Sequence, residues 1–165
     1  MRKTIAILAG LAVLGMANWT IYSRERLLTE GRVVLLELAP VDPRSLMQGG
    51  YMALRFKAEV VAFGRGRVKD VEDGRIVVKL DPRGVGEFVR RDAGEPLAGD
   101  EVALRYRVRD GMVKFATNAF FFHEGHAKVY ERARYGEMRV APTGELLLTG
   151  LRAENLERLG PAAAR

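Results

Sequence analysis

The chain has 165 residues, of which 48% are hydrophobic, carries a formal net charge of +6 and contains no cysteine. This length is enough for one domain of ordinary size. The absence of cysteine excludes disulfides, thiolate nucleophiles and cysteine-ligated zinc. Because the basic residues are interspersed with Asp and Glu, without the like-charged run typical of a nucleic-acid arm, the sequence predicts no nucleic-acid partner.

The N-terminus predicts a membrane anchor over residues 1–22. Residues 4–22 form an uncharged run of 19 residues, and about 20 apolar residues at roughly 1.5 Å each cross a hydrocarbon core of roughly 30 Å. Trp19 and Tyr22 end the run, where aromatic rings favour the membrane interface. Arg2 and Lys3 favour a cytoplasmic N-terminus. The prediction is a single-pass cell-membrane protein, with lipid around this helix and the C-terminal domain outside the cytoplasm.

A cleaved signal peptide is the alternative interpretation of the same segment. Residues 5–16 would form its apolar region, and Gly15, Met16 and Ala17 offer small residues near a cleavage site. The apolar run continues past Ala17 into the interface aromatics, which a signal peptide does not need. Both interpretations deliver the rest of the chain outside the cytoplasm.

The remainder of the chain predicts strands and tight turns. Residues 33–38 (VVLLEL) have the β-branched apolar character of a buried strand. Further strands and hairpins follow from alternation and from Asp-Gly or Pro-Thr-Gly turns. They are expected at residues 51–63, at 65–71 with 75–81, at 101–108 with 112–117, and at 137–140 with 145–151. A surface loop is expected over 81–99, a helix over 123–135 and a short closing helix over 153–159.

One local pattern occurs twice, fifty residues apart. Residues 49–56 (GGYMALRF) align without gaps with residues 99–106 (GDEVALRY), and both launch an alternating strand from glycine. The domain is therefore interpreted as a pseudo-repeated antiparallel sheet or small barrel, although similar turn-and-strand units also arise by chance.

The first copy, with its lead-in VDPRSLMQG, resembles the motif of the GDYXXLXY family of bacterial membrane-anchored proteins. Gly49, Tyr51 and Leu54 match that motif, whereas Gly50 stands in the place of its Asp and Phe56 in the place of its final Tyr. Residues 120–140 and 143–151 also look like that family. The resemblance implies an accessory role beside a polytopic membrane protein.

The predicted fold class is mainly β (α+β): an N-terminal transmembrane helix, then a small antiparallel β domain or partial barrel with one packed helix. The expected division is an anchor, a juxtamembrane connector, a GDYXXLXY-like extracytoplasmic β domain and a C-terminal tail, over residues 1–22, 23–32, 33–152 and 153–165.

The predicted function is a non-enzymatic accessory or interaction module of the bacterial envelope, with no cofactor, metal or catalytic residue assigned. Its candidate interaction surface combines aromatic and arginine side chains, which are enriched at binding hot spots, with their neighbours in the repeated motif. It consists of Arg44, Gly49, Tyr51, Leu54, Arg55, Phe56, Arg105 and Tyr106.

Three alternatives assign a chemistry to the domain. A Ser-Lys hydrolase related to signal peptidases would use Ser45 with Lys57 or Lys79, but Val41 stands where that pattern has its nucleophile. His123 and His126, with Glu124 beside them and Glu131 or Asp100 as a third ligand, would make a zinc site. A small-ligand or lipid-binding β domain would need an open cavity.

Overall fold

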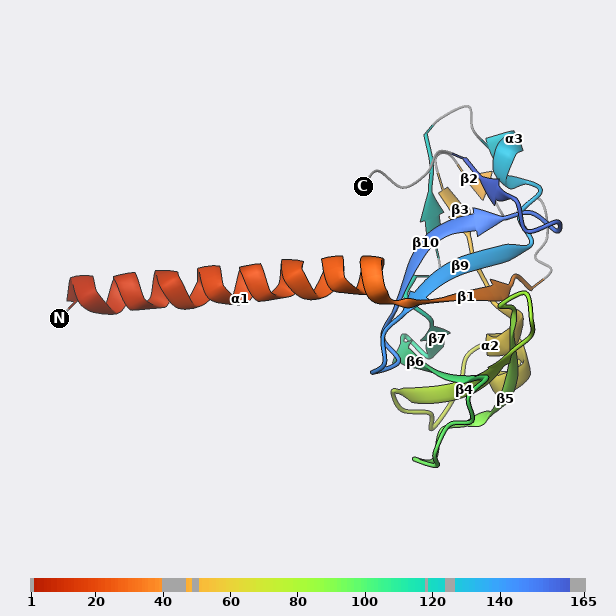
Figure 1. Cartoon of the computed structure of the whole chain (residues 1–165), viewed down its shortest axis with the longest axis horizontal. Coiled ribbons are helices and arrows are strands. Elements are labelled where there is room, and N and C mark those ends of the chain that lie inside the picture. The colour runs from red at the N-terminus through yellow and green to blue at the C-terminus, as the bar shows by residue number, and fades with distance from the viewer. Residues whose placement is uncertain (1, 40–46, 49–50, 118, 124–126, 161–165) are drawn as a thin grey trace.

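A computed structural model describes residues 2–39, 47–48, 51–117, 119–123 and 127–160. Figure 1 shows one long helix that projects from a β domain made of small antiparallel sheets. The predicted fold class, mainly β with antiparallel strands, is confirmed at this level.

Helix α1 (Arg2–Glu30) stands clear of the β domain along most of its length (Figure 1). Its apolar side chains between Ile7 and Tyr22 are exposed, and Leu27, near its end, is buried. Arg24 forms an ion pair with Glu145 at 3.3 Å, which ties the end of the helix to the domain. In the part of the chain that the structure describes, no helix is long and apolar enough to cross a membrane.

The first sheet has the strand order β1-β9-β10-β11. Its strands are β1 (Arg32–Glu37), β9 (Tyr135–Val140), β10 (Leu146–Arg152) and β11 (Arg158–Leu159). The strand expected from VVLLEL and the hairpin expected around Pro-Thr-Gly are both confirmed. Gly144 takes a φ of 84° in that turn, a value that favours glycine.

The second sheet has the strand order β5-β4-β6-β7. Its strands are β5 (Gly86–Arg91), β4 (Gly74–Leu80), β6 (Glu101–Arg109) and β7 (Met112–Lys114). Asp110 and Gly111 join β6 to β7 with φ values of 56° and 71°. Two successive positive φ values match the twist of a two-residue hairpin turn, so this predicted hairpin is also confirmed.

The third sheet is short and has the order β2-β3-β8, from β2 (Met47–Gln48), β3 (Tyr51–Ala53) and β8 (Ala119–Phe121). Backbone hydrogen bonds outside the ladders join the first two sheets: the Leu35 amide donates to Gly84 at 2.9 Å, and the Arg105 amide to Gly144 at 2.8 Å. One core cluster draws on all three sheets. Its largest fully buried side chains are Phe56, Phe115, Leu36, Ile76, Leu104, Met138 and Leu151.

The strand predicted over residues 57–63 is wrong, because this segment forms helix α2 (Lys57–Phe63). Apart from its two valines and Phe63 the segment contains good helix formers, and Gly64, with a φ of 80°, ends the helix by donating its amide to the Val60 carbonyl. Phe63 then packs against Tyr106 with ring centroids 4.7 Å apart. Tertiary packing and the glycine cap outweigh the β preference of the two valines.

The strand predicted over residues 65–71 is also wrong. Strand β4 has β5 on one side and β6 on the other, so both of its edges are occupied. Residues 65–71 form a loop in which the Val68 amide donates to the Gly111 carbonyl at 2.7 Å. The loop expected over 81–99 contains β5.

Two further segments depart from the prediction. The expected helix over 123–135 is described only as the short helix α3 (Ala127–Tyr130), and residues 124–126 lie outside the described part. The closing helix is replaced by a turn and β11, where Leu159 is buried against the core. In its described residues the domain therefore carries two short helices, α2 and α3, and its first sheet reaches into the segment expected to be a tail.

Candidate functional site

The predicted interaction surface divides between core and exterior. Leu54, Phe56 and Tyr106 are buried in the core, so their side chains offer no contact surface. Tyr51 and Arg105 are exposed and Arg55 is partly exposed. Arg44 and Gly49 lie outside the described residues.

The two copies of the repeated motif share one packing pattern. Alternate residues point into the core in each copy: 52, 54 and 56 in the first, and 102, 104 and 106 in the second. Phe56 and Tyr106 both pack edge-on against Phe115, with centroid distances of 6.3 and 6.4 Å. The strands themselves lie in different sheets. The two copies of the motif therefore occupy equivalent positions in the core, but they do not form a repeated sheet.

An exposed aromatic pair lies on β3 and β8. Tyr51 and Phe121 are cross-strand partners with ring centroids 6.0 Å apart, and they are 37% and 75% exposed. Phe120 and Phe122 instead pack against Tyr130, at 5.0 and 5.2 Å. We call Tyr51 and Phe121 the aromatic pair. Sequence analysis missed Phe121. The signal that could have found it is the alternation of side chains along a strand, which places the middle phenylalanine of residues 120–122 on the opposite face from its two neighbours.

Arg55 is partly exposed and forms a long ion pair with a carboxylate on α2. Its guanidinium lies 3.9 Å from Glu59, whose side chain is buried. Burial raises the pKa of Glu59, while the charge of Arg55 opposes that rise. One Glu59 carboxylate oxygen, Oε2, has no hydrogen-bond partner among the described residues. The Arg55 guanidinium therefore balances the charge of the buried Glu59 carboxylate. For this reason Arg55 is a weaker candidate than Tyr51 for contact with a partner.

The residues of the hydrolase hypothesis are not brought together in the described part. Ser45 and Val41 lie outside it. Lys57 pairs with Glu37 at 2.8 Å, and Lys79 pairs with Asp100 at 3.3 Å. Both lysines are exposed at the surface rather than desolvated, and a lysine base needs desolvation to lose its proton near neutral pH.

The zinc hypothesis falls partly outside the described chain. His123 is exposed, and Glu124 and His126 lie outside the described residues. Among the described residues, no three His, Asp or Glu side chains lie close enough together to hold a metal ion.

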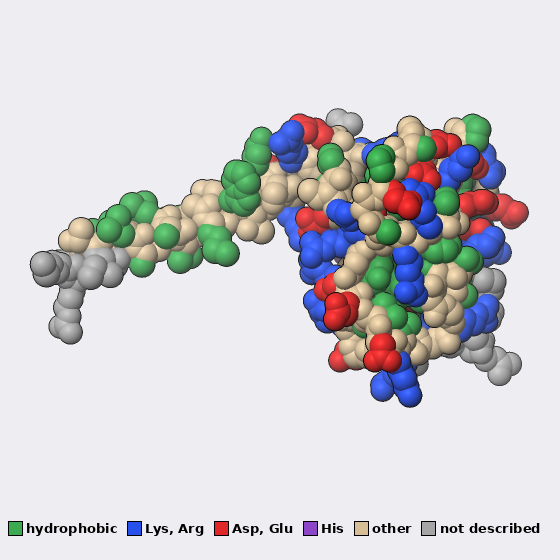
Figure 2. Space-filling view, turned by 90° about the horizontal axis from the view of Figure 1, so that it is seen from below, with side chains coloured by type: hydrophobic (Ala, Val, Ile, Leu, Met, Phe, Trp, Pro, Cys, Tyr) green, Lys and Arg blue, Asp and Glu red, His purple; other side chains and the backbone are tan. Residues whose placement is uncertain are grey.

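A basic pocket of about 250 Å³ opens where α1 meets the domain. Its charged lining comes from α1, β6, β7 and the β9–β10 turn. The lining residues are Arg24, Arg105, Arg107, Arg109, Lys114, Ala116, Glu145 and Leu146. Figure 2 shows Lys and Arg side chains on the side of the domain that faces the helix, as well as others over the rest of the visible face.

Few of these cations are neutralised locally. Arg24 pairs with Glu145, and Arg109 pairs with Asp73 at 3.2 Å. The Asp73 carboxylate also accepts the Val108 amide, and this hydrogen bond, with the charge of Arg109, holds its pKa below the ordinary value. Within the described structure, Arg105, Arg107 and Lys114 have no side-chain ion pair or hydrogen bond, although the charge of Arg107 also acts on the Asp73 carboxylate.

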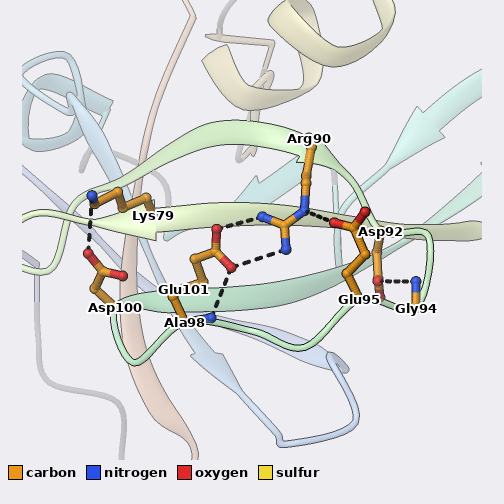
Figure 3. Close-up of polar contacts among 8 residues, drawn as sticks. All are labelled: Lys79, Arg90, Asp92, Gly94, Glu95, Ala98, Asp100 and Glu101. Atoms are coloured by element: carbon orange, nitrogen blue, oxygen red, sulfur yellow. Dashed lines mark hydrogen bonds and ion pairs between the residues drawn. The ribbon is translucent and has the colours of Figure 1, made fainter.

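A different part of the second sheet shows the opposite arrangement (Figure 3). Arg90 donates two hydrogen bonds to Glu101, at 2.5 and 3.2 Å, and also pairs with Glu95 at 3.0 Å. The hydrogen bonds from Arg90 hold the pKa of Glu101 below its ordinary value. Lys79 pairs with Asp100. In this cluster the cations Arg90 and Lys79 are paired with carboxylates. The basic pocket, by contrast, contains cations without a paired carboxylate.

The comparisons with known proteins identify the family and nothing beyond it. No curated protein and no solved structure matches the chain. The sequence profile of the family described as GDYXXLXY protein matches residues 13–151, which is most of the chain. The chain therefore belongs to the GDYXXLXY family.

Proposed function

We propose that this protein is a membrane-anchored accessory or interaction module of the bacterial envelope. Helix α1 would hold it in the cell membrane, with the β domain outside the cytoplasm and a polytopic membrane protein as partner. One observation carries the proposal: α1 projects from the domain with its apolar side chains exposed (Figures 1 and 2).

The exposed part of α1 suits a lipid environment. Ile7, Leu11 and Trp19 are among side chains that are more than half exposed along its length. Burying an apolar side chain of this size contributes about 1.5–3 kcal/mol, and the β domain covers none of these three. A helix that is apolar on all sides is stable when surrounded by apolar material. The uncharged run over residues 4–22 and the flanking Arg2 and Lys3 agree with an anchor whose N-terminus is cytoplasmic.

Trp19 provides a direct test of anchoring because it is the only tryptophan in the chain. In full-length protein reconstituted into vesicles, we expect lipids brominated near the headgroup to quench Trp19 more strongly than lipids brominated deep in the acyl chains. The physical reason is the preference of indole for the interface. Emission that no brominated lipid quenches would refute the anchor.

A matched pair of variants checks the same claim. Val13→Arg places a charge at the middle of the uncharged run, at a cost of about 2.5–3.5 kcal/mol for insertion, and should reduce the quenched fraction. Leu28→Arg places the same charge on α1 beyond the run and should leave the fraction unchanged.

The aromatic pair is the best-supported surface for a protein partner. Phe121 exposes most of its ring, and Tyr51 lies directly beside it on the neighbouring strand. Large aromatic side chains dominate the energy of binding interfaces. The family motif contributes Tyr51 to this surface, while its Leu54 and Phe56 positions face the core.

Crosslinking from the native membrane tests this surface. Wild-type protein should capture a polytopic membrane protein, and the double variant Tyr51→Ala with Phe121→Ala should lose at least nine-tenths of it, because loss of two hot-spot side chains costs about 2 kcal/mol or more. Val61→Ala with Leu97→Ala removes two other exposed apolar side chains and should retain capture. Equal capture by both double variants, with equal folding by circular dichroism, would contradict the assignment.

A further inference from the structure

The lining of the basic pocket is strongly unbalanced in charge. Five basic side chains line it with one carboxylate, that of Glu145, which pairs with Arg24, while Arg109 pairs with Asp73 outside the lining. Arg105, Arg107 and Arg109 alternate along the exposed face of β6, and Lys114 lies directly opposite Arg107 on β7. Like charges directly opposite one another in a sheet are destabilising.

Another basic cluster on the same sheet is paired with carboxylates, which makes the imbalance in the pocket informative. In the cluster around Arg90, Arg90 of β5 reaches across β4 to Glu101 of β6 and also pairs with Glu95, and Lys79 of β4 pairs with Asp100 (Figure 3). In the basic pocket, by contrast, an anion from outside the described chain would relieve the repulsion among Arg105, Arg107 and Lys114. The arrangement therefore indicates a site for an anionic ligand.

The position of the pocket selects the kind of anion. Arg24 lines it and lies two residues beyond Tyr22, the last residue of the uncharged run. A helix rises about 1.5 Å per residue, so Arg24 lies only about 3 Å along the helix axis past that aromatic residue. If α1 is the anchor, the pocket faces the lipid headgroups.

Arginine is the side chain best suited to a phosphate, because its planar guanidinium donates two parallel hydrogen bonds to phosphate oxygens. A volume of about 250 Å³ admits a headgroup phosphate with its glycerol, and the charged lining disfavours an acyl chain. We propose that the basic pocket binds the phosphate group of an anionic membrane phospholipid, with Arg105, Arg107 and Lys114 as its main ligands. This inference rests on the proposed anchoring, because anchoring is what brings the pocket to the headgroups.

The test uses full-length protein in a neutral detergent and short-chain phosphatidylglycerol, which needs no bilayer. Calorimetric titration should show binding of phosphatidylglycerol at least tenfold tighter than binding of short-chain phosphatidylcholine. Arg105→Gln with Arg107→Gln should weaken phosphatidylglycerol binding by about 30-fold, the expected loss for two arginines near an anionic headgroup. Lys114→Gln, a single change on a different strand, should weaken it by about fivefold.

The matched control is Arg65→Gln with Arg132→Gln, which removes the same charge from two exposed arginines outside the pocket. It should bind within about twofold of wild type. Equal binding of the two lipids, or equal loss in both double variants, would overturn the inference. Inorganic phosphate that binds as tightly as phosphatidylglycerol would overturn the lipid assignment in favour of free phosphate.

The outcomes separate this inference from the proposed anchor. A chain whose Trp19 is quenched in vesicles but which shows no preference for phosphatidylglycerol refutes the pocket assignment alone. A chain that prefers phosphatidylglycerol through these arginines but is not quenched supports the pocket and refutes the anchor.

Discussion

Replacing Glu137 with alanine is expected to destabilise the β domain by about 3–5 kcal/mol, the usual cost of removing one partner of a buried ion pair. Glu137 lies on β9 and is 4% exposed. Its carboxylate accepts hydrogen bonds from the Thr149 hydroxyl at 2.9 Å and from Arg152 at 2.6 Å, and Arg158 lies 3.6 Å away. The variant leaves two half-buried guanidinium groups without their shared carboxylate. Partial exposure of both arginines places the loss toward the lower end of the range.

The loss should depend on pH with a defined sign. Burial alone would raise the pKa of Glu137, but the hydrogen bonds from Thr149 and Arg152 and the charges of Arg152 and Arg158 hold it below its ordinary value of 4.5. Because the folded pKa is lowered, the ionised group stabilises the fold fully above the ordinary pKa. That stabilisation is lost as pH falls through the lower, folded value.

Urea unfolding followed by far-ultraviolet circular dichroism measures this effect, because Trp19 lies on α1 and does not report on the β domain. The difference between wild type and Glu137→Ala should be largest at pH 7 and should shrink at about pH 3. Glu154→Ala, at an exposed residue in the turn after β10, should change stability by less than about 0.5 kcal/mol. A Glu137→Ala loss of the same size at both pH values would show that its charge contributes nothing.

The elements that sequence analysis located are those whose signals are local. Strand β1 is a continuous apolar run, and the β6–β7 hairpin contains Asp110 and Gly111 at a turn that requires positive φ. The β9–β10 hairpin likewise has Gly144 in its turn. In each case a few neighbouring residues determine both the turn and the alternation of the strands around it.

The elements that it misassigned depend on distant contacts. Val60 and Val61 favour a strand locally, but residues 57–63 become helical where Phe63 meets Tyr106 of β6. The edges of β4 are filled by strands later in the chain, which leaves residues 65–71 as a loop. Neither outcome is visible in a short window of sequence.

The candidate site shows the same division. Tyr51 was predicted from its motif, but its partner Phe121 comes from a strand seventy residues away, and only the fold makes them neighbours. The basic pocket combines side chains of four elements, so its charge cannot be read from the interspersed basic and acidic residues of the sequence. Arg105 was predicted as part of an aromatic and arginine surface, and the structure places it in this pocket instead.

Replacing Phe56 with alanine is expected to destabilise the domain by about 3–5 kcal/mol, because it removes an aromatic ring from a close-packed core. Phe56 is 0% exposed and packs edge-on against Phe115. A Cβ added at Gly136 on β9 would lie 2.8 Å from the Phe56 ring, so the ring fills the space that this glycine leaves open. The residue in the last position of the family motif thus joins β3, α2 and β9 through the core.

Phe121→Ala is the matched control, because it deletes the same ring from a position that is 75% exposed. Loss of its contact with Tyr51 should cost at most about 1 kcal/mol. Urea unfolding by circular dichroism should therefore separate the two variants by at least about 2 kcal/mol. Similar losses would mean that Phe56 is not a core residue. The expected separation would instead assign the final aromatic position of the motif to folding, and leave Tyr51 as the motif residue available to a partner.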